Sequence, residues 1–306
     1  MEYIEYLIQG IVQGLTEFLP VSSSGHLNIL QHLFGYTESN LFLNVMLHLG
    51  TLVSVCVFYH KLIIRLFKAF VSMVGDIFRG KFSWKNMDYD RNLLVMLVIG
   101  LVPLFLLFVP IGNGMKVKDL ADIFSSDPKF FFVTGIALLA TSLLLLTGIV
   151  LNKRRRSLIA AGKVKKKERY TVADALVVGV TQVVAAIFPG LSRSGSTLAA
   201  GQARGISKQK ALDYTFVLAI PSILAAAVLE FKDVIEANAL ANINWGAVIL
   251  GVAAAAVVGY LSIALFKWLL KTDKTYVFVI YTALAGAAVI IVSIIEKVTG
   301  NVVTFY

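Results

Sequence analysis

The chain contains two short polar segments whose residue types could bind and transfer phosphate. The first spans residues 13–26 and contains an acid, Glu17, within an apolar stretch. A charged side chain at membrane depth is costly, so Glu17 should have a partner or a function. Gln13 lies one helical turn earlier on the same face. Together they would present oxygen ligands to one spot, which suits a hard divalent cation; the alternative is a structural pair between Glu17 and an arginine.

Hydroxyl and imidazole groups follow Glu17 closely. Pro20 ends the first half-helix, and three serines then offer hydroxyls and caps for a short helix that begins near Gly25: Ser22, Ser23 and Ser24. The free N–H groups of a helix N-terminus bind phosphate, and His26 can move a proton to or from a phosphate oxygen. Serines with a glycine also form ordinary turns. Three histidines lack such neighbours and are interpreted as packing or interfacial residues: His32, His48 and His60.

The second polar segment, 189–197, is richer in phosphate-binding groups. Its Pro-Gly pair predicts a turn, and Ser192 can cap the helix that follows. Arg193 offers a planar fork that binds phosphate oxygens with two hydrogen bonds. Hydroxyls crowd the same turn: Ser194, Ser196 and Thr197. The alternative is that Arg193 only neutralises Glu17, and both roles are compatible. An acid, hydroxyls, an imidazole and a guanidinium in one membrane cavity would suit phosphoryl transfer on a lipid.

The composition places these groups in a membrane. Of the 306 residues, 58% are hydrophobic and 15% are charged, against roughly 45–50% and about 25% in soluble domains. Too little polar surface is available for a cytosolic enzyme, a nucleic-acid binder or a disordered tail. The net charge of +10 therefore bears on orientation in the bilayer rather than on nucleic acid.

Six apolar stretches are long enough, or nearly so, to span a bilayer. They cover residues 39–59, 92–111, 130–151, 211–229, 246–266 and 275–295. Two further stretches, 6–19 and 175–188, run into the polar segments and stop halfway, as re-entrant helices do. The expected fold is an all-α polytopic membrane protein with six transmembrane helices and two re-entrant helical segments.

The two re-entrant segments are copies of each other. Residues 10–13 match 179–182 and Pro20 matches Pro189 at an offset of 169, and residues 23–25 match 193–195 at an offset of 170. We expect two inverted repeats, each a re-entrant segment plus three spans. They cover residues 1–152 and 174–306, and a basic cytoplasmic linker, 153–173, joins them. Broken helices in such repeats meet at the binding site.

Charge predicts the orientation. Four loops, 60–91, 152–173, 192–210 and 267–274, contain 23 of the 28 lysines and arginines. Because cytoplasmic loops are enriched in such residues, these loops are expected inside and both termini outside. The basic linker would then lie against anionic membrane lipid. The positive charge of this linker is explained more simply as an anchor of membrane topology than as a binding site for a specific lipid.

The two polar segments, 13–26 and 189–197, closely resemble the signature motifs of the bacitracin-resistance family of undecaprenyl-diphosphate phosphatases. The resemblance covers essentially the whole chain. It implies an enzyme of the bacterial inner (plasma) membrane that converts undecaprenyl diphosphate to undecaprenyl phosphate and phosphate. Such an enzyme recycles the carrier lipid of peptidoglycan synthesis and confers bacitracin resistance. The resemblance also implies dependence on Mg²⁺ or Ca²⁺ and a site open to the outer face.

Carried over by position, the family's functional residues are Gln13, Glu17, Ser23, His26, Ser192, Arg193 and Thr197. Because residue 13 is a glutamine and not an acid in this chain, Glu17 must act as the acid alone. In the expected mechanism Glu17 anchors the metal, Arg193 grips the diphosphate and His26 acts as general acid or base. Ser23 or an activated water attacks, and that choice stays open. The other residues expected to bind the diphosphate are Gln13, Ser22, Ser24, Ser192, Ser194 and Thr197.

Two other classes of membrane protein share parts of this pattern. Lipid phosphatases related to type-2 phosphatidic acid phosphatase need a nucleophilic histidine after their Ser-Arg element, and this chain has no histidine after His60. That class is excluded. A polyprenyl-phosphate transporter or flippase is the alternative, because inverted repeats with a site at the midplane are typical of transporters. The sequence leaves the oligomeric state, including a homo-oligomer, open.

Overall fold

The computed structural model describes residues 2–35, 41–84, 87–112, 114–126, 128–236 and 243–304. Within them the chain is almost entirely helical, as predicted, with one two-stranded hairpin of β1 (Pro110–Gly112) and β2 (Met115–Lys116). The helices of the first half are α1 (Glu2–Phe18), α2 (Ser23–Leu33), α3 (Leu41–Phe58), α4 (His60–Phe78), α5 (Tyr89–Leu101), η2 (Val102–Phe108), α6 (Asp119–Ser126), η3 (Pro128–Phe130) and α7 (Phe131–Ala160). Those of the second half are α8 (Val172–Ile187), α9 (Arg193–Ala203), α10 (Lys208–Glu236), α11 (Trp245–Lys271) and α12 (Tyr276–Thr299).

Five of the six predicted membrane stretches correspond to helices that can span a bilayer, and the sixth, 39–59, corresponds to α3. Five helical segments in the described part of the chain are long and apolar enough to cross a bilayer: Tyr89–Phe108, Phe131–Ala160, Lys208–Leu229, Trp245–Lys271 and Tyr276–Thr299. A sixth span arises if α3 and α4 count as one, although the chain bends by 80° between them. The chain is therefore a multi-pass membrane protein.

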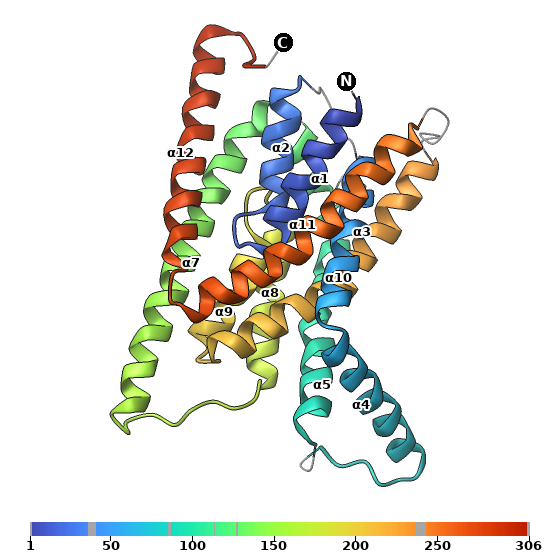
Figure 1. Ribbon diagram of the computed structural model, residues 1–306, viewed down its shortest axis with the longest axis vertical. Helices are drawn as coiled ribbons and strands as arrows, with labels where there is room; N and C mark the ends of the chain where they lie inside the picture. The colour runs from blue at the N-terminus through green and yellow to red at the C-terminus, as the bar shows by residue number, and fades with distance from the viewer. Residues whose placement is uncertain are drawn as a thin grey trace.

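The loop predicted at 60–91 is partly wrong, because residues 60–78 form the helix α4. Its apolar residues recur at helical spacing, so that Leu66 and Ala69 are buried while its basic residues lie on the other side. Figure 1 shows α4 and α5 side by side, projecting beyond the rest of the bundle. Similarly, α7 continues past the predicted end of its span at 151 to Ala160, so part of the predicted linker is helical.

Both predicted breaks are present. Between α1 and α2, Ser22 caps α2 by accepting a hydrogen bond from the Gly25 N–H at 3.2 Å. Between α8 and α9, Ser192 caps α9 by accepting from the Gly195 N–H at 3.0 Å. The same cap thus occurs at equivalent positions, as the internal repeat predicts.

The two breaks pack directly against each other. A Cβ atom on Gly25 would lie 2.8 Å from the Gly190 Cα atom, and one on Gly195 would lie 3.2 Å from the Pro20 Cβ atom. The Ser194 hydroxyl donates to the Leu19 carbonyl at 3.2 Å. No side chain fits between these turns, so the first residues of α2 and α9 are brought together.

Glycines allow the helices to approach closely. A Cβ atom on Gly10 of α1 would overlap the Gly251 carbonyl of α11, and one on Gly179 of α8 would overlap the Gly100 carbonyl of α5. Small residues at such crossings are typical of membrane helices. Because positions 10 and 179 are equivalent in the predicted repeat, these paired crossings fit it.

The charged loops gather at one end of the molecule. Figure 1 shows both ends of the chain at the top, and the α4–α5 and α7–α8 connections at the bottom. Residues 60–91 and 152–173, which comprise these connections together with α4 and the adjoining helix ends, contain 16 of the 28 lysines and arginines. The chain ends therefore lie opposite the most basic end of the bundle.

The close crossing of α8 and α5 can be tested by adding one methyl group. Gly179→Ala should cost about 1–3 kcal/mol of the free energy of unfolding, because the backbone of α5 blocks the new atom. Gly75→Ala is the matched control on α4, where nothing lies within 4 Å of the added atom; it should be neutral or stabilise by up to about 1 kcal/mol. Unfolding in mixed detergent micelles measures both, and equal effects would contradict the close crossing.

Candidate active site

The carboxylate of Glu17 lies where four helices meet. Its side chain, at the end of α1, is only 3% exposed. Gln13 Nε2 donates to Glu17 Oε2 at 3.0 Å, and the Ser23 hydroxyl of α2 donates to the same oxygen at 2.6 Å. Arg193 of α9 forms an ion pair with Glu17 Oε1, and His48 Nε2 of α3 lies 3.5 Å from Oε2. The two halves of the chain thus share one carboxylate.

Local sequence explains why Ser23 and Arg193 reach the same group. Each is the first helical residue after a capping serine, Ser22 in one break and Ser192 in the other. Because the two turns pack against each other, these equivalent positions face the same point. A hydroxyl and a guanidinium therefore meet at Glu17, as the sequence predicts for Ser23 and Arg193.

The arrangement of Gln13 differs from the expectation. The sequence predicts that Gln13 and Glu17 present oxygens to one spot, but Gln13 uses its amide nitrogen to hold Glu17. Its Oε1 atom is buried and has no hydrogen-bond partner. Within the described residues, no three His, Cys, Asp or Glu side chains cluster closely enough to hold a metal by themselves.

His48 was interpreted from the sequence as a packing or interfacial residue, and its position beside Glu17 shows that interpretation to be wrong. Its Nδ1 atom bonds to the Asn44 carbonyl at 2.6 Å, so Nδ1 carries a proton. The signal was available, because His48 is the one histidine in the apolar stretch 39–59. His32 instead pairs with Glu296 at 2.7 Å.

His26 points away from Glu17. Its Nε2 atom lies 2.7 Å from the Tyr281 hydroxyl of α12, and its Nδ1 atom lies 2.7 Å from the Ser22 carbonyl. The ring also stacks on Tyr281, with ring centres 5.6 Å apart. The structure therefore connects His26 to Ser23 through the first turn of α2 and not by direct contact. Tyr281 was not singled out by any sequence pattern.

Most of the predicted phosphate-binding hydroxyls stabilise the breaks themselves. Ser22 and Ser192 are buried caps. The hydroxyl of each lies within 3.3 Å of the serine hydroxyl two residues later, that of Ser24 or Ser194. The Thr197 hydroxyl donates to the Arg193 carbonyl at 2.8 Å. Ser24 is the exposed member of the group. Of the predicted hydroxyls, Ser23 is the one bonded to Glu17.

A small cavity of about 80 Å³ opens beside the ion pair. Its lining combines an imidazole and a guanidinium with apolar groups: Val45, His48, Arg193, Ile223, Ala226 and Ala227. An anion in this space would contact a guanidinium and an imidazole. The same site offers Ser23 as a nucleophile and Glu17 as the acceptor of its proton.

The shared carboxylate predicts strong coupling between the two halves. Arg193→Gln should lower the free energy of unfolding by about 3–5 kcal/mol, because Glu17 would stay buried without its main counter-charge. Adding Glu17→Gln to that variant should recover part of the loss. Unfolding in mixed micelles of the two single variants and the double variant measures this, and strictly additive losses would contradict a direct pair.

Comparison with known proteins agrees with this geometry. The profile of the family described as "Bacitracin resistance protein BacA" matches residues 6–288. A protein named undecaprenyl-diphosphatase from Alkaliphilus metalliredigens is 38% identical over 296 residues, which is 96% of this chain and all of the relative. One from Bacteroides fragilis is 35% identical over 96% of this chain and 99% of its own length. One from Methanosphaera stadtmanae is 32% identical, with the same coverage of each chain.

The family profile extends over both breaks, and every side chain that meets at Glu17 lies within the matched residues. The chain belongs to the bacitracin resistance protein family.

Proposed function

We propose that the chain hydrolyses undecaprenyl diphosphate to undecaprenyl phosphate and inorganic phosphate. The observation that carries the proposal is the contact of Ser23 and Arg193 with one buried carboxylate, Glu17. A nucleophile and a guanidinium are thereby placed on one proton acceptor, and the guanidinium also lines the small cavity beside it. The relatives named undecaprenyl-diphosphatase supply the identity of the substrate. Hydrolysis would return the carrier lipid to peptidoglycan synthesis and confer resistance to bacitracin.

In the proposed reaction the terminal phosphate of the diphosphate enters the cavity next to Arg193. The Ser23 oxygen attacks the terminal phosphorus, and the Ser23 proton passes to Glu17, which lies 2.6 Å away. The bond between that phosphorus and the bridging oxygen breaks, and undecaprenyl phosphate leaves. Water then hydrolyses the phosphoserine. A water held by Glu17 in place of the hydroxyl would perform the same displacement in one step.

Arg193 supplies positive charge next to the transferred phosphate, and His48 supplies an imidazole on the same cavity wall. Arg193 bonds to Glu17 through one nitrogen, and its side chain also lines the cavity, as does His48. A guanidinium has five N–H donors, so it can hold the carboxylate and a phosphate oxygen together. We assign His26 to positioning, because its bond to the Ser22 carbonyl fixes the turn that presents Ser23.

A divalent cation, Mg²⁺ or Ca²⁺, fits this site when substrate is bound. The buried Gln13 Oε1 atom has no partner, and Glu17 supplies one carboxylate. Cations of this kind bind through one or two carboxylates, with phosphate oxygens and water completing the shell. When bound, the cation would neutralise charge on the diphosphate.

We place the protein in the bacterial inner (plasma) membrane, with both termini outside and the site open to the outer face. The positive-inside bias supports this orientation, because the loops at the end opposite the chain termini are rich in lysine and arginine.

The proposal is tested by phosphate release from undecaprenyl diphosphate by the purified protein in detergent with Mg²⁺. Glu17→Ala and Arg193→Ala should each lower kcat by about 10²–10³-fold or more, because each removes a charge next to the transferred group. Arg154→Ala, an exposed arginine on α7, is the control and should match the wild type. EDTA should abolish release. Lipid binding without release by folded wild-type protein would overturn the hydrolase and favour the lipid transporter.

The role of His48 is tested against a matched histidine. His48→Gln should lower kcat by about 10²-fold, because it removes the imidazole that lines the cavity beside Glu17. His60→Gln should have no effect, since His60 is exposed and bonds to the Val57 carbonyl of its own turn. Equal activities of the two variants would remove His48 from the site.

The choice between serine and water is tested by trapping. Acid quenching of a reaction with substrate labelled at the terminal phosphate should leave label on Ser23 in the wild type, because phosphoserine is stable in acid. Ser24→Ala should still be labelled, whereas Ser23→Ala should not. Full turnover by Ser23→Ala without label would assign the attack to water.

A further inference from the structure

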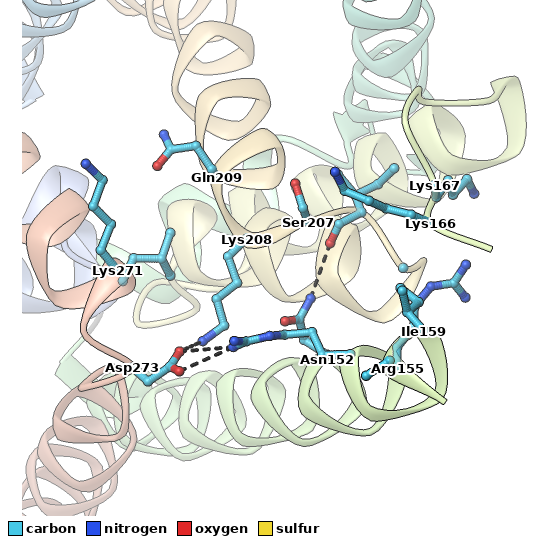
Figure 2. Close-up of a pocket in the computed structure, with 15 residues that line it drawn as sticks. Asn152, Arg155, Ile159, Lys166, Lys167, Ser207, Lys208, Gln209, Lys271 and Asp273 are labelled. Atoms are coloured by element: carbon cyan, nitrogen blue, oxygen red, sulfur yellow. Dashed lines mark hydrogen bonds and ion pairs between the residues drawn. The ribbon is translucent and has the colours of Figure 1, made fainter. Parts of the chain in front are cut away.

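A second, larger cavity lies far from Glu17, at the basic end of the molecule. It has a volume of about 530 Å³ and is formed by the end of α7, the turn between α9 and α10, and the turn between α11 and α12. Helix α9 begins at Arg193 in the active site and ends at this cavity. Its 11 residues separate the two sites by about 15 Å. Figure 2 shows the lining side chains.

Six cationic side chains line this cavity, against one acid, Asp273: Arg155, Arg156, Lys166, Lys167, Lys208 and Lys271. Asp273 pairs with Lys208 and, at 3.3 Å, with Arg156. The hydrogen bond from Lys208 lowers the pKa of the Asp273 carboxyl, which therefore stays charged. Lys166 and Lys167 pair with Glu168 and Asp174, which do not line the cavity. Asp273 is then the one lining carboxylate for the other four cations, so the cavity has a net positive charge.

Two polar atoms buried in the cavity wall have no hydrogen-bond partner. Asn152 is 4% exposed, and its Nδ2 atom donates to the Ile206 carbonyl at 3.3 Å, which fixes the amide (Figure 2). Its Oδ1 atom is left without a donor, and the Arg155 Nε atom is left without an acceptor. Buried polar groups are nearly always paired in native proteins. The cavity thus offers one buried donor and one buried acceptor to a ligand.

The N-terminus of α10 adds further donors. Ser207, Lys208 and Gln209 line the cavity at the start of this 29-residue helix. The first N–H groups of a helix lack partners within the helix and attract anions. Ile206 and Leu270 give the remaining wall an apolar character, which suits the uncharged part of an amphiphile.

We propose that this cavity binds a ligand that carries both a phosphate group and a hydroxyl group. The phosphate oxygens accept from Arg155 Nε and the α10 N-terminus, and the hydroxyl donates to Asn152 Oδ1. Two sources have this chemistry: inorganic phosphate and the headgroup of an anionic glycerophospholipid such as phosphatidylglycerol. The inference does not depend on the proposed hydrolase, because none of its residues contacts the active site.

The test is native mass spectrometry of the full chain, purified without phosphate and titrated with dioctanoyl phosphatidylglycerol. One lipid should bind to the wild type, and dioctanoyl phosphatidylcholine should bind at least tenfold more weakly. Arg155→Gln should weaken phosphatidylglycerol binding about tenfold, as expected for loss of a charged hydrogen bond. Arg154→Gln is the matched control, with the same charge change on the next residue, which does not line the cavity. Lys271→Gln is a second cavity variant if Arg155→Gln does not fold.

Competition with sodium phosphate identifies the source. If phosphate displaces phosphatidylglycerol, the site binds phosphate groups in general. If phosphatidylglycerol stays bound, the site recognises the lipid headgroup. Both results support the proposal. Phosphatidylcholine that binds as tightly as phosphatidylglycerol would overturn it. So would equal weakening by Arg154→Gln and Arg155→Gln.

Discussion

The whole arrangement depends on one buried negative charge. A carboxylate in a membrane interior must have a counter-charge close by, and Glu17 finds it in Arg193, 176 residues further along the chain. To bring the two together, both helices that carry the polar segments must stop within the molecule, and their turns must touch. The capping serines and the glycines at the breaks are the local means to that end. Packing, topology and chemistry thus follow from the need to neutralise a single group.

Much of the fold could be predicted because bilayer physics leaves few options. Apolar length defines the spans, and the proline and capping serines define the breaks. Helix α4 was missed because hydropathy over a whole span does not register an amphipathic helix whose polar face contains Lys61, Arg65 and Lys68. An 80° bend precedes it, and α4 then packs against α5, a contact between helices that no local pattern encodes.

The same distinction applies to the site. Glu17, Ser23 and Arg193 could be identified because charged and hydroxyl residues are conspicuous in apolar surroundings. The direction in which each side chain points could not be predicted, because it depends on partners far along the chain. His26 turns to Tyr281, 255 residues away, and His48 turns to Glu17 from a different helix. Residue type therefore predicted the groups available, whereas only the fold assigns each group its neighbour.

The near-equivalence of the two breaks has a consequence for how such a protein could arise. The position in the second half that corresponds to Glu17 is Ala186, and Ser23 corresponds to Arg193. One copy thus contributes the anion and the hydroxyl, while the other contributes the cation. An ancestor made of two identical subunits would have repeated every charge, with two carboxylates or two guanidiniums facing each other across its axis. The differences between the two halves of this chain avoid that repetition, and the asymmetry leaves a single reactive centre where the two breaks meet.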